Sequence, residues 1–275
     1  MKNLKKISGL FVLVFALLLT GCGSNNEDSN LITVSGSTSV APLMESLIEA
    51  YEENNDVTFN FSVDGSSAGV TAAAEGVSDI GMVSRDLSDS EKELGLTENV
   101  IATDGIAIIL NPENDVTNLT FEQVQQIYTG EITNWNEVGG SDLPIVIISR
   151  EDGSGTRGAF DEIVGLLNED GTSKMVNPII GNGTGGVIES ISQNPAAIGY
   201  VSASSAHAAG DDVKIISVND VNPDSENIRN GSYPISRRFD IVSKNESQAT
   251  LDFIAWILSE QGQEIVEQRG YTPIN

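Results

Sequence analysis

Residues 144–167 read PIVIISREDGSGTRGAFDEIVGLL, and this stretch combines three local patterns. The apolar run Pro144–Ser149 is typical of a buried strand, and a helix is expected from Thr156 to Leu167. The turn between them, Arg150–Thr156, is rich in serine and glycine and would offer backbone N–H groups at the start of the helix, where anions bind. A strand, a turn and a helix in this order predict an α/β protein.

Two similar turns occur earlier in the chain. A first turn, Gly36–Ser39, follows a strand expected over Leu31–Ser35, and a second, Gly65–Gly69, follows a strand expected over Val57–Val63. Any one turn is most simply an ordinary helix cap, because Ser and Thr are preferred at that position. Three such turns at the carboxyl ends of expected strands favour a ligand site, since open α/β sheets bind ligands at that edge.

Arginine is scarce, and Arg150 stands at the start of the third turn, four residues before Ser154. A planar guanidinium can hold a tetrahedral oxyanion with two hydrogen bonds. Arg85 also follows an apolar run and a serine. The alternative for each arginine is a surface ion pair with one of the many acidic residues.

Short apolar runs alternate with helical patterns over the rest of the chain. Further strands are expected at 79–84, 100–110, 178–180, 197–202, 213–218 and 236–244, and further helices at 40–54, 121–128 and 247–269. The glycines at 181, 183 and 186 and the small-residue stretch before His207 are interpreted as loops. The alternation predicts an α/β architecture with mostly parallel sheets. Two domains would require the chain to cross between them more than once, because no internal linker is present.

The composition excludes several function classes. The chain has 14 basic and 40 acidic residues, a formal net charge of −26, so its surface repels nucleic acid and anionic lipid headgroups. One Cys and one His exclude a disulfide and most metal sites. We therefore expect no nucleic-acid partner, no metal and no cofactor.

The N-terminal residues have the pattern of a targeting segment. Three lysines precede the apolar run Leu10–Leu19, which is too short to span a membrane and is typical of a signal peptide. The run ends in Leu19-Thr20-Gly21-Cys22, which resembles the lipobox of bacterial lipoproteins and implies that Cys22 is diacylated. We expect a signal peptide over 1–21 and a lipid-anchored flexible tether over 22–30. The alternative is a plain secretory signal with a chance cysteine.

The order of motifs from about Ile32 to Asn275 resembles the phosphate-binding lipoproteins that supply ABC-type phosphate importers. The resemblance is strongest at Arg150–Thr156 and extends to the segments 119–123, 133–135, 195–201 and 233–235. It implies a two-lobed type II periplasmic-binding protein, in which each lobe is a mostly parallel sheet flanked by helices and the ligand lies in the cleft. Lobe I would comprise 31–107 and 237–275, and lobe II 108–236, with crossings near Ile106–Leu110 and Ser236–Arg238.

The resemblance also implies a phosphate site built from the three turns. Its ligand contacts would be Thr38, Ser39, Ser66, Arg150, Ser154, Gly155 and Thr156. Many family members place an Asp after the third short strand to accept the phosphate proton, and the corresponding residues here are Ser84, Arg85 and Asp86. Asp86 is the candidate acceptor, or Asp152 if the loop register differs; Asp152 is otherwise expected to orient Arg150.

The function implied by the resemblance is the capture of inorganic phosphate on the outer face of the cell membrane, without catalysis. A monomer anchored by lipid on Cys22 would deliver phosphate to the membrane permease subunits of an ABC importer. One alternative is another tetrahedral oxyanion, such as sulfate, molybdate or tungstate. A second is a serine hydrolase, because Gly65–Gly69 matches G-x-S-x-G with Ser67 as nucleophile and His207 as base. A third is an adhesive surface lipoprotein with a vestigial pocket.

Overall fold

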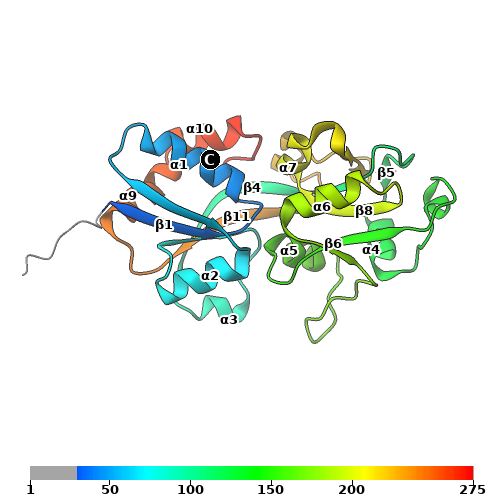
Figure 1. Ribbon diagram of the computed structural model, residues 1–275, viewed down its shortest axis with the longest axis horizontal. Coiled ribbons are helices and arrows are strands. Elements are labelled where there is room, and N and C mark those ends of the chain that lie inside the picture. The colour runs from blue at the N-terminus through cyan, green and yellow to red at the C-terminus, as the bar shows by residue number, and fades with distance from the viewer. Residues whose placement is uncertain (1–29, 275) are drawn as a thin grey trace, which may run out of the picture.

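Two lobes lie side by side in the computed structural model and are joined by two long strands, β4 and β11 (Figure 1). The structure describes residues 30–274. The predicted signal peptide, Cys22 and most of the predicted tether therefore lie outside the described residues. No helix in this described part is long and apolar enough to cross a membrane.

The first lobe contains both ends of the described chain, and the second lobe is formed by its middle. The first lobe holds β1 Leu31–Gly36, α1 Ala41–Glu52, β2 Thr58–Val63, α2 Ser66–Glu75, β3 Ile80–Val83, α3 Asp89–Lys92, the start of β4 Thr97–Leu110, most of β11 Ser236–Ser243, α9 Gln248–Ile257 and α10 Glu260–Gln268. The second holds β5 Asn118–Leu119, α4 Phe121–Thr129, β6 Val146–Arg150, α5 Gly155–Ile163, β7 Ile179–Gly181, α6 Gly183–Ser192, β8 Ala197–Ser202, α7 Ala203–Ala208, β9 Lys214–Ile215, β10 Ser217–Val218 and α8 Ser225–Arg229, with 3₁₀ turns at Trp135–Val138 and Gly210–Asp212.

One continuous mixed sheet runs through both lobes in the order β2-β1-β3-β11-β4-β8-β6-β7. The outer strands are parallel, as expected: β1 pairs with β2 and β3, and β6 pairs with β7 and β8. The two crossing strands are antiparallel to each other and to their neighbours β3 and β8. The predicted mostly parallel pairing holds for the outer strands of each lobe, and the sheet is antiparallel at the centre, where the chain crosses in one direction and returns in the other.

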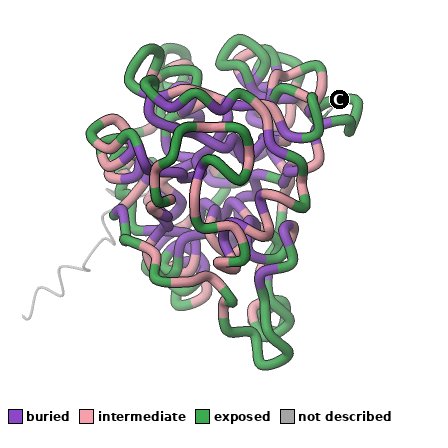
Figure 2. The backbone as a smooth tube through the Cα atoms, turned by 90° about the vertical axis from the view of Figure 1, so that its right-hand side faces the viewer, coloured by how far each residue is buried: buried purple, intermediate pink, exposed green. Residues whose placement is uncertain are grey.

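Each lobe has its own hydrophobic core. The core of the first lobe takes residues of β4 up to Ala102, and the core of the second takes residues of the same strand from Ile106 onward. Buried backbone runs through the interior, and exposed backbone lies mainly in the peripheral loops (Figure 2). Gly105 and Ser236 face each other in register where β4 and β11 pass between the cores. This pair lies where the two cores separate.

Three local expectations are wrong, each because a tertiary contact decides the conformation. Of the glycines interpreted as a loop, Gly181 ends β7 and the other two lie in α6; Gly181 allows α6 to pack closely, because a Cβ there would lie 2.8 Å from the Val187 backbone nitrogen. His207 lies on α7 and not in a loop. The single strand expected over 213–218 is two short strands, β9 on β4 and β10 on β5.

Candidate functional site

The three serine-and-glycine turns meet between the lobes. The first and second turns come from the first lobe, and the third comes from the second lobe. The backbone nitrogen of Ser67 donates to the carbonyl oxygen of Gly153 at 3.2 Å, and the hydroxyls of Ser39 and Thr156 are 2.8 Å apart. The structure therefore brings together turns that are more than 80 residues apart in the sequence, across the boundary of two cores.

Two glycines are tightly surrounded at this junction. Gly36 has a φ of +132°, and a Cβ there would collide with the carbonyl oxygen of Met82. A Cβ at Gly155 would collide with the side-chain oxygens of Ser66 and Ser84 on the opposite lobe. Glycine is required at both positions, at the first for its conformation and at the second because the other lobe occupies the space.

Six hydroxyl side chains, which we call the hydroxyl cluster, line the junction of the turns: Ser37, Thr38, Ser39, Ser66, Ser84 and Thr156. All are buried except Thr38, which is half-buried. The Ser37 hydroxyl accepts from the backbone nitrogens of Ser39 and Val40 and donates to the Ser84 oxygen at 2.8 Å. Ser37 was not among the expected site residues, although it belongs to the first turn.

The third turn contributes Ser154 and Gly155 as well as Thr156. The Ser154 side chain accepts from the backbone nitrogen of Arg157 at 3.3 Å and so caps α5, which is the ordinary role of such a residue. Gly155 and Thr156 are the first two residues of the helix, and both are buried. Backbone N–H groups at the start of a helix have no partner within the helix, so this end can stabilise an anion.

Arg150 lies at the junction, and its charged side chain is only 1% exposed. Its Nε and Nη2 atoms donate to the two carboxylate oxygens of Glu151, at 2.9 and 2.7 Å. Nη2 also donates to the Thr38 hydroxyl in the other lobe at 2.8 Å. The remaining nitrogen, Nη1, is buried and has no hydrogen-bond partner among the described residues. A guanidinium can only donate, so the partner that suits Nη1 is an acceptor.

Glu151, and not Asp152, orients Arg150. Asp152 is exposed and pairs with Arg157 at 2.6 Å, so the role expected for Asp152 is wrong. Burial works to raise the pKa of the Glu151 carboxyl, but the hydrogen bonds and charge of Arg150 outweigh it and the pKa lies below its usual value. The backbone nitrogen of Gly183, at the start of α6, also donates to Glu151. The direction of neighbouring side chains in a turn depends on backbone angles that the residue types do not reveal.

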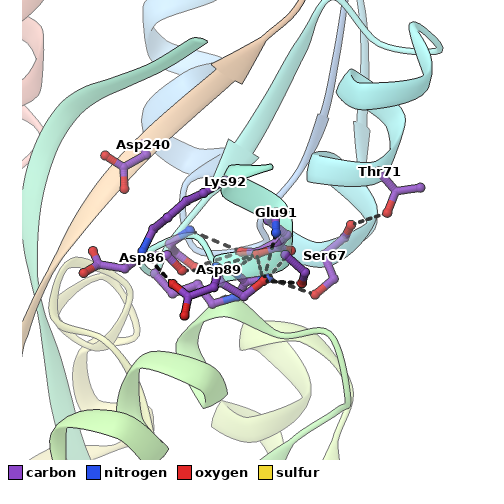
Figure 3. Close-up of polar contacts among 12 residues, drawn as sticks. Ser67, Thr71, Asp86, Asp89, Glu91, Lys92 and Asp240 are labelled. Atoms are coloured by element: carbon purple, nitrogen blue, oxygen red, sulfur yellow. Dashed lines mark hydrogen bonds and ion pairs between the residues drawn. The ribbon is translucent and has the colours of Figure 1, made fainter. Parts of the chain in front are cut away.

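The segment after β3 places its three candidates differently. Ser84 belongs to the hydroxyl cluster, whereas Arg85 turns away to the carboxylate of Glu91, at 2.7 and 2.8 Å, and to the Ser67 hydroxyl. Asp86 is exposed and pairs with Arg238 at 3.2 Å. Asp86 and Ser67 lie at opposite ends of this polar network (Figure 3). Asp86 therefore does not face the hydroxyl cluster, and the proton-accepting role expected for it has no support in its position.

Ion pairing with Arg85 also affects the pKa of Glu91 in this network. Burial raises the pKa of Glu91, but the hydrogen bonds and charge of Arg85 and the hydrogen bonds of Ser88 outweigh that effect and the pKa lies below normal. Glu91 thus remains a carboxylate and holds Arg85 at the edge of the cleft. A cavity of about 450 Å³ adjoins this arginine and is lined from both lobes, by Ser67, Arg85, Asp152, Gly153, Ser154, Arg157, Gly158, Asp161, Leu167, Gly171, Thr172 and Ser173.

A second buried arginine, Arg237, contacts the cluster and was not expected from the sequence. Its Nη1 donates to the Thr156 hydroxyl at 2.7 Å, and its Nη2 pairs with Asp104 at 3.2 Å. Burial raises the pKa of Asp104, and the charge of Arg237 opposes that rise. The only sequence signal was the position of Arg237 in the expected crossing segment, which suggested a hinge and not a binding role.

The hydrolase pair is not assembled. The Ser67 hydroxyl accepts from Arg85 at 3.1 Å in the first lobe. The Nδ1 atom of His207 lies 2.7 Å from the carbonyl oxygen of Ala203 on α7 in the second lobe. Within residues 30–274, no group of three or more His, Cys, Asp or Glu side chains could hold a metal ion. The site consists of hydroxyls, helix N-termini and two arginines, which suits the binding of an anion.

The similarity of this chain to known proteins covers both lobes. A family model described as the PBP superfamily domain matches residues 23–261. The phosphate-binding protein PstS of Borreliella burgdorferi is 33% identical, over 98% of this chain and 99% of its own length. The phosphate-binding protein PstS of Bacillus subtilis is 30% identical, over 100% and 95%.

Two solved structures are similar to this chain in architecture as well as in sequence. A phosphate ABC transporter substrate-binding protein from Clostridium perfringens, solved with bound phosphate, is 47% identical with a TM-score of 0.83, over 90% of this chain and 100% of that one. An ABC-type phosphate transport receptor from Vibrio cholerae is 37% identical with a TM-score of 0.73, over 88% and 99%. The residues that the family model matches, 23–261, include the three turns and both crossing strands.

Proposed function

The chain belongs to the PBP superfamily and, within it, to the phosphate-binding proteins of ABC transporters, and on this premise we propose that it captures inorganic phosphate outside the cytoplasm. It has the fold of a type II periplasmic-binding protein. The family transports its ligand and performs no chemistry on it. The work of the protein is therefore to bind phosphate and to release it to an importer.

The free Nη1 atom of Arg150 carries this proposal. A buried donor without a partner is destabilising by about 1–3 kcal/mol, and an anionic oxygen removes that penalty with a charge-assisted hydrogen bond. The turns around Arg150 supply the other donors that a tetrahedral anion needs. We assign the phosphate contacts to the hydroxyls, N–H groups and guanidinium of Thr38, Ser39, Ser66, Ser84, Arg150, Ser154, Gly155 and Thr156.

Capture depends on closure of the lobes. Contacts such as Arg150 with Thr38 and Ser39 with Thr156 join the two lobes, so the site is complete only when they meet. A phosphate ion held by donors from both sides favours this arrangement over an open one. Opening about Gly105 and Ser236 would separate the two sets of donors and release the ion.

The acceptor for the proton of monohydrogen phosphate is then a hydroxyl oxygen. Glu151 and Asp104, the carboxylates paired with the two arginines that contact the cluster, are both engaged by those arginines. A serine or threonine hydroxyl can accept a hydrogen bond as well as donate one, so the cluster can serve a protonated oxygen. A site of this kind discriminates less sharply between phosphate and sulfate than one with a free carboxylate aimed at the ligand.

Membrane attachment is part of the same proposal. The lipobox-like sequence ending at Cys22 supports a diacyl anchor, and residues 22–30 would tether the anchor to the first lobe, where β1 begins at Leu31. The protein would work as a monomer on the outer face of the membrane beside its permease subunits. Radiolabelled palmitate tests the anchor: the label should enter the full chain and be absent from Cys22→Ser.

Isothermal calorimetry on the chain from residue 23 onward tests the binding function. We expect saturable binding of phosphate, competition by arsenate, which has the same shape and protonation, and weaker binding of sulfate. Molybdate and tungstate should not displace phosphate at equal concentration. Absence of saturable phosphate binding would refute the proposal. Tighter binding of sulfate than of phosphate would favour the alternative that the protein captures another tetrahedral oxyanion.

A further inference from the structure

Arg237 lies on the strand that crosses between the lobes and pairs with a carboxylate on the other crossing strand. Arg237 on β11 and Asp104 on β4 are direct partners in the antiparallel register. Both side chains are 2% exposed, and Nη2 of Arg237 lies 3.2 Å from Oδ2 of Asp104. Oδ1 of Asp104 accepts from the Ser202 hydroxyl at 3.1 Å, so the carboxylate is held on two sides. The pair is fixed in the interior at the place where the two cores separate.

The opposite side of the Arg237 guanidinium contacts both lobes. Its Nη1 atom donates to the carbonyl oxygen of Ser84 at 3.0 Å in the first lobe and to the Thr156 hydroxyl at 2.7 Å in the second. Ser84 and Thr156 belong to the hydroxyl cluster on which the proposed phosphate site is built. One guanidinium thus joins a crossing strand to the two halves of the site.

The contact with Thr156 determines the direction in which its proton points. A guanidinium has no acceptor, so the Thr156 oxygen must accept from Arg237, and its own proton must point elsewhere. The remaining neighbours are the Ser39 hydroxyl at 2.8 Å and the ligand position. Arg237 therefore leaves the Thr156 proton to point away from the crossing strand, toward Ser39 or the proposed ligand position.

We propose that Arg237 is a positioning residue for phosphate, which directs the Thr156 hydroxyl toward the ligand and ties both lobes to the crossing strand. The proposal rests on the phosphate-binding function given above. Asp104 holds Arg237 in place, as Glu151 holds Arg150. Arg237 does not replace Arg150, because its own contacts are to the protein groups that surround the ligand.

A double-mutant cycle in phosphate affinity tests the proposal. Arg237→Lys keeps the charge but loses the planar fork, and Thr156→Val removes the hydroxyl that Arg237 contacts. Arg237→Lys should weaken phosphate binding by about 10- to 100-fold, mainly through faster dissociation, because it removes a hydrogen bond from a charged group. In the double variant, the loss of phosphate affinity should be clearly smaller than the product of the two single losses, because both substitutions remove the same contact between Arg237 and Thr156.

The matched control is Arg238→Lys, at the next residue, whose side chain is 43% exposed and pairs with Asp86 and Glu98. Its effect should be small and independent of Thr156→Val. If Arg237→Lys does not fold, Arg237→Met combined with Asp104→Leu removes both buried charges together and should show the same loss and the same coupling to Thr156. If Arg237 had a purely structural role, its substitution would lower the melting temperature, but the loss of phosphate affinity in the double variant would equal the product of the two single losses.

Two outcomes separate the inference from the function on which it rests. If the unmodified protein binds phosphate and the Arg237–Thr156 cycle is multiplicative, or if Arg237→Lys binds within twofold of the unmodified protein, the positioning role is refuted alone. If the unmodified protein does not bind phosphate, the proposed function fails and the positioning role fails with it.

Discussion

Replacing Arg150 with methionine should abolish most of the phosphate affinity while leaving the fold intact. Methionine fills much of the volume of the arginine stem but lacks the guanidinium. The variant loses the free Nη1 donor and the Nη2 contact to Thr38 across the cleft. It also leaves Glu151 without its cation, although the backbone nitrogen of Gly183 still donates to that carboxylate.

The expected loss of phosphate affinity follows from the burial of Arg150 and its partners. Removal of one partner from a buried, charge-assisted contact decreases binding by about 2–5 kcal/mol. The Glu151 side chain is 27% exposed, so water partly compensates the unpaired carboxylate and the lower part of this range applies. About 2–3.5 kcal/mol corresponds to a loss in affinity of about 30- to 300-fold.

Stability without phosphate should change much less than affinity. The substitution removes Nη1, a buried donor that has no partner among the described residues. Its removal stabilises the fold by about 1–3 kcal/mol, which offsets the loss of the ion pair with Glu151. The pKa of Glu151 is lowered in the folded protein, so the pair stabilises the fold above the ordinary carboxyl pKa and this effect is lost as the pH falls through the lowered value. Arg150→Met should remove that part of the pH dependence.

Calorimetry with phosphate and thermal unfolding without it, between pH 4 and pH 8, provide both readouts. The matched control is Arg229→Met on α8, where the side chain is 53% exposed and pairs with Glu267 at the surface. The control should bind phosphate as the unmodified protein does. Binding by Arg150→Met within threefold of the unmodified protein would refute the assignment of the site to the third turn.

Three further predictions concern the partner of Arg150, the close approach at Gly155 and the ionisation of Asp240. Glu151→Gln should weaken phosphate binding by about tenfold by releasing Arg150, whereas Asp152→Asn should leave it unchanged; equal effects in calorimetry would contradict the assignment of Glu151 as the orienting carboxylate. Gly155→Ala should prevent closure, because its Cβ meets hydroxyls of the other lobe, so small-angle scattering should show no compaction on addition of phosphate; normal compaction would disprove the steric argument. Burial raises the pKa of Asp240 to about 7, so its folded state resists ionisation, and stability falls as the pH rises from about 4 to about 7. Asp240→Asn should therefore raise the melting temperature more at pH 8 than at pH 5, and an equal gain at both would show that ionisation of Asp240 is not the cause.

Much of the fold could be predicted because its signals are local. The strands β1, β2, β3 and β6 and the helices α1 and α4 follow apolar spacing and capping patterns within about a dozen residues, and the structure has them close to the expected bounds. The α5 helix ends earlier than expected, at Ile163, with Gly165 shortly after it at a φ of +75°. Helix α6 was missed because its glycines suit a loop by composition, while contact with β7 makes them suitable for a helix.

The sequence by itself determined the α/β class, the three turns at strand ends and the place of Arg150 at the start of the third turn, because each depends on residues that are neighbours along the chain. Only the tertiary structure decided which charges meet. Arg237 and Asp104 are 133 residues apart, and Glu151 replaces Asp152 as the partner of Arg150 through the direction of one side chain. Strand register sets the first of these contacts and the backbone angles of the turn set the second, and neither is encoded in a local pattern of residue types.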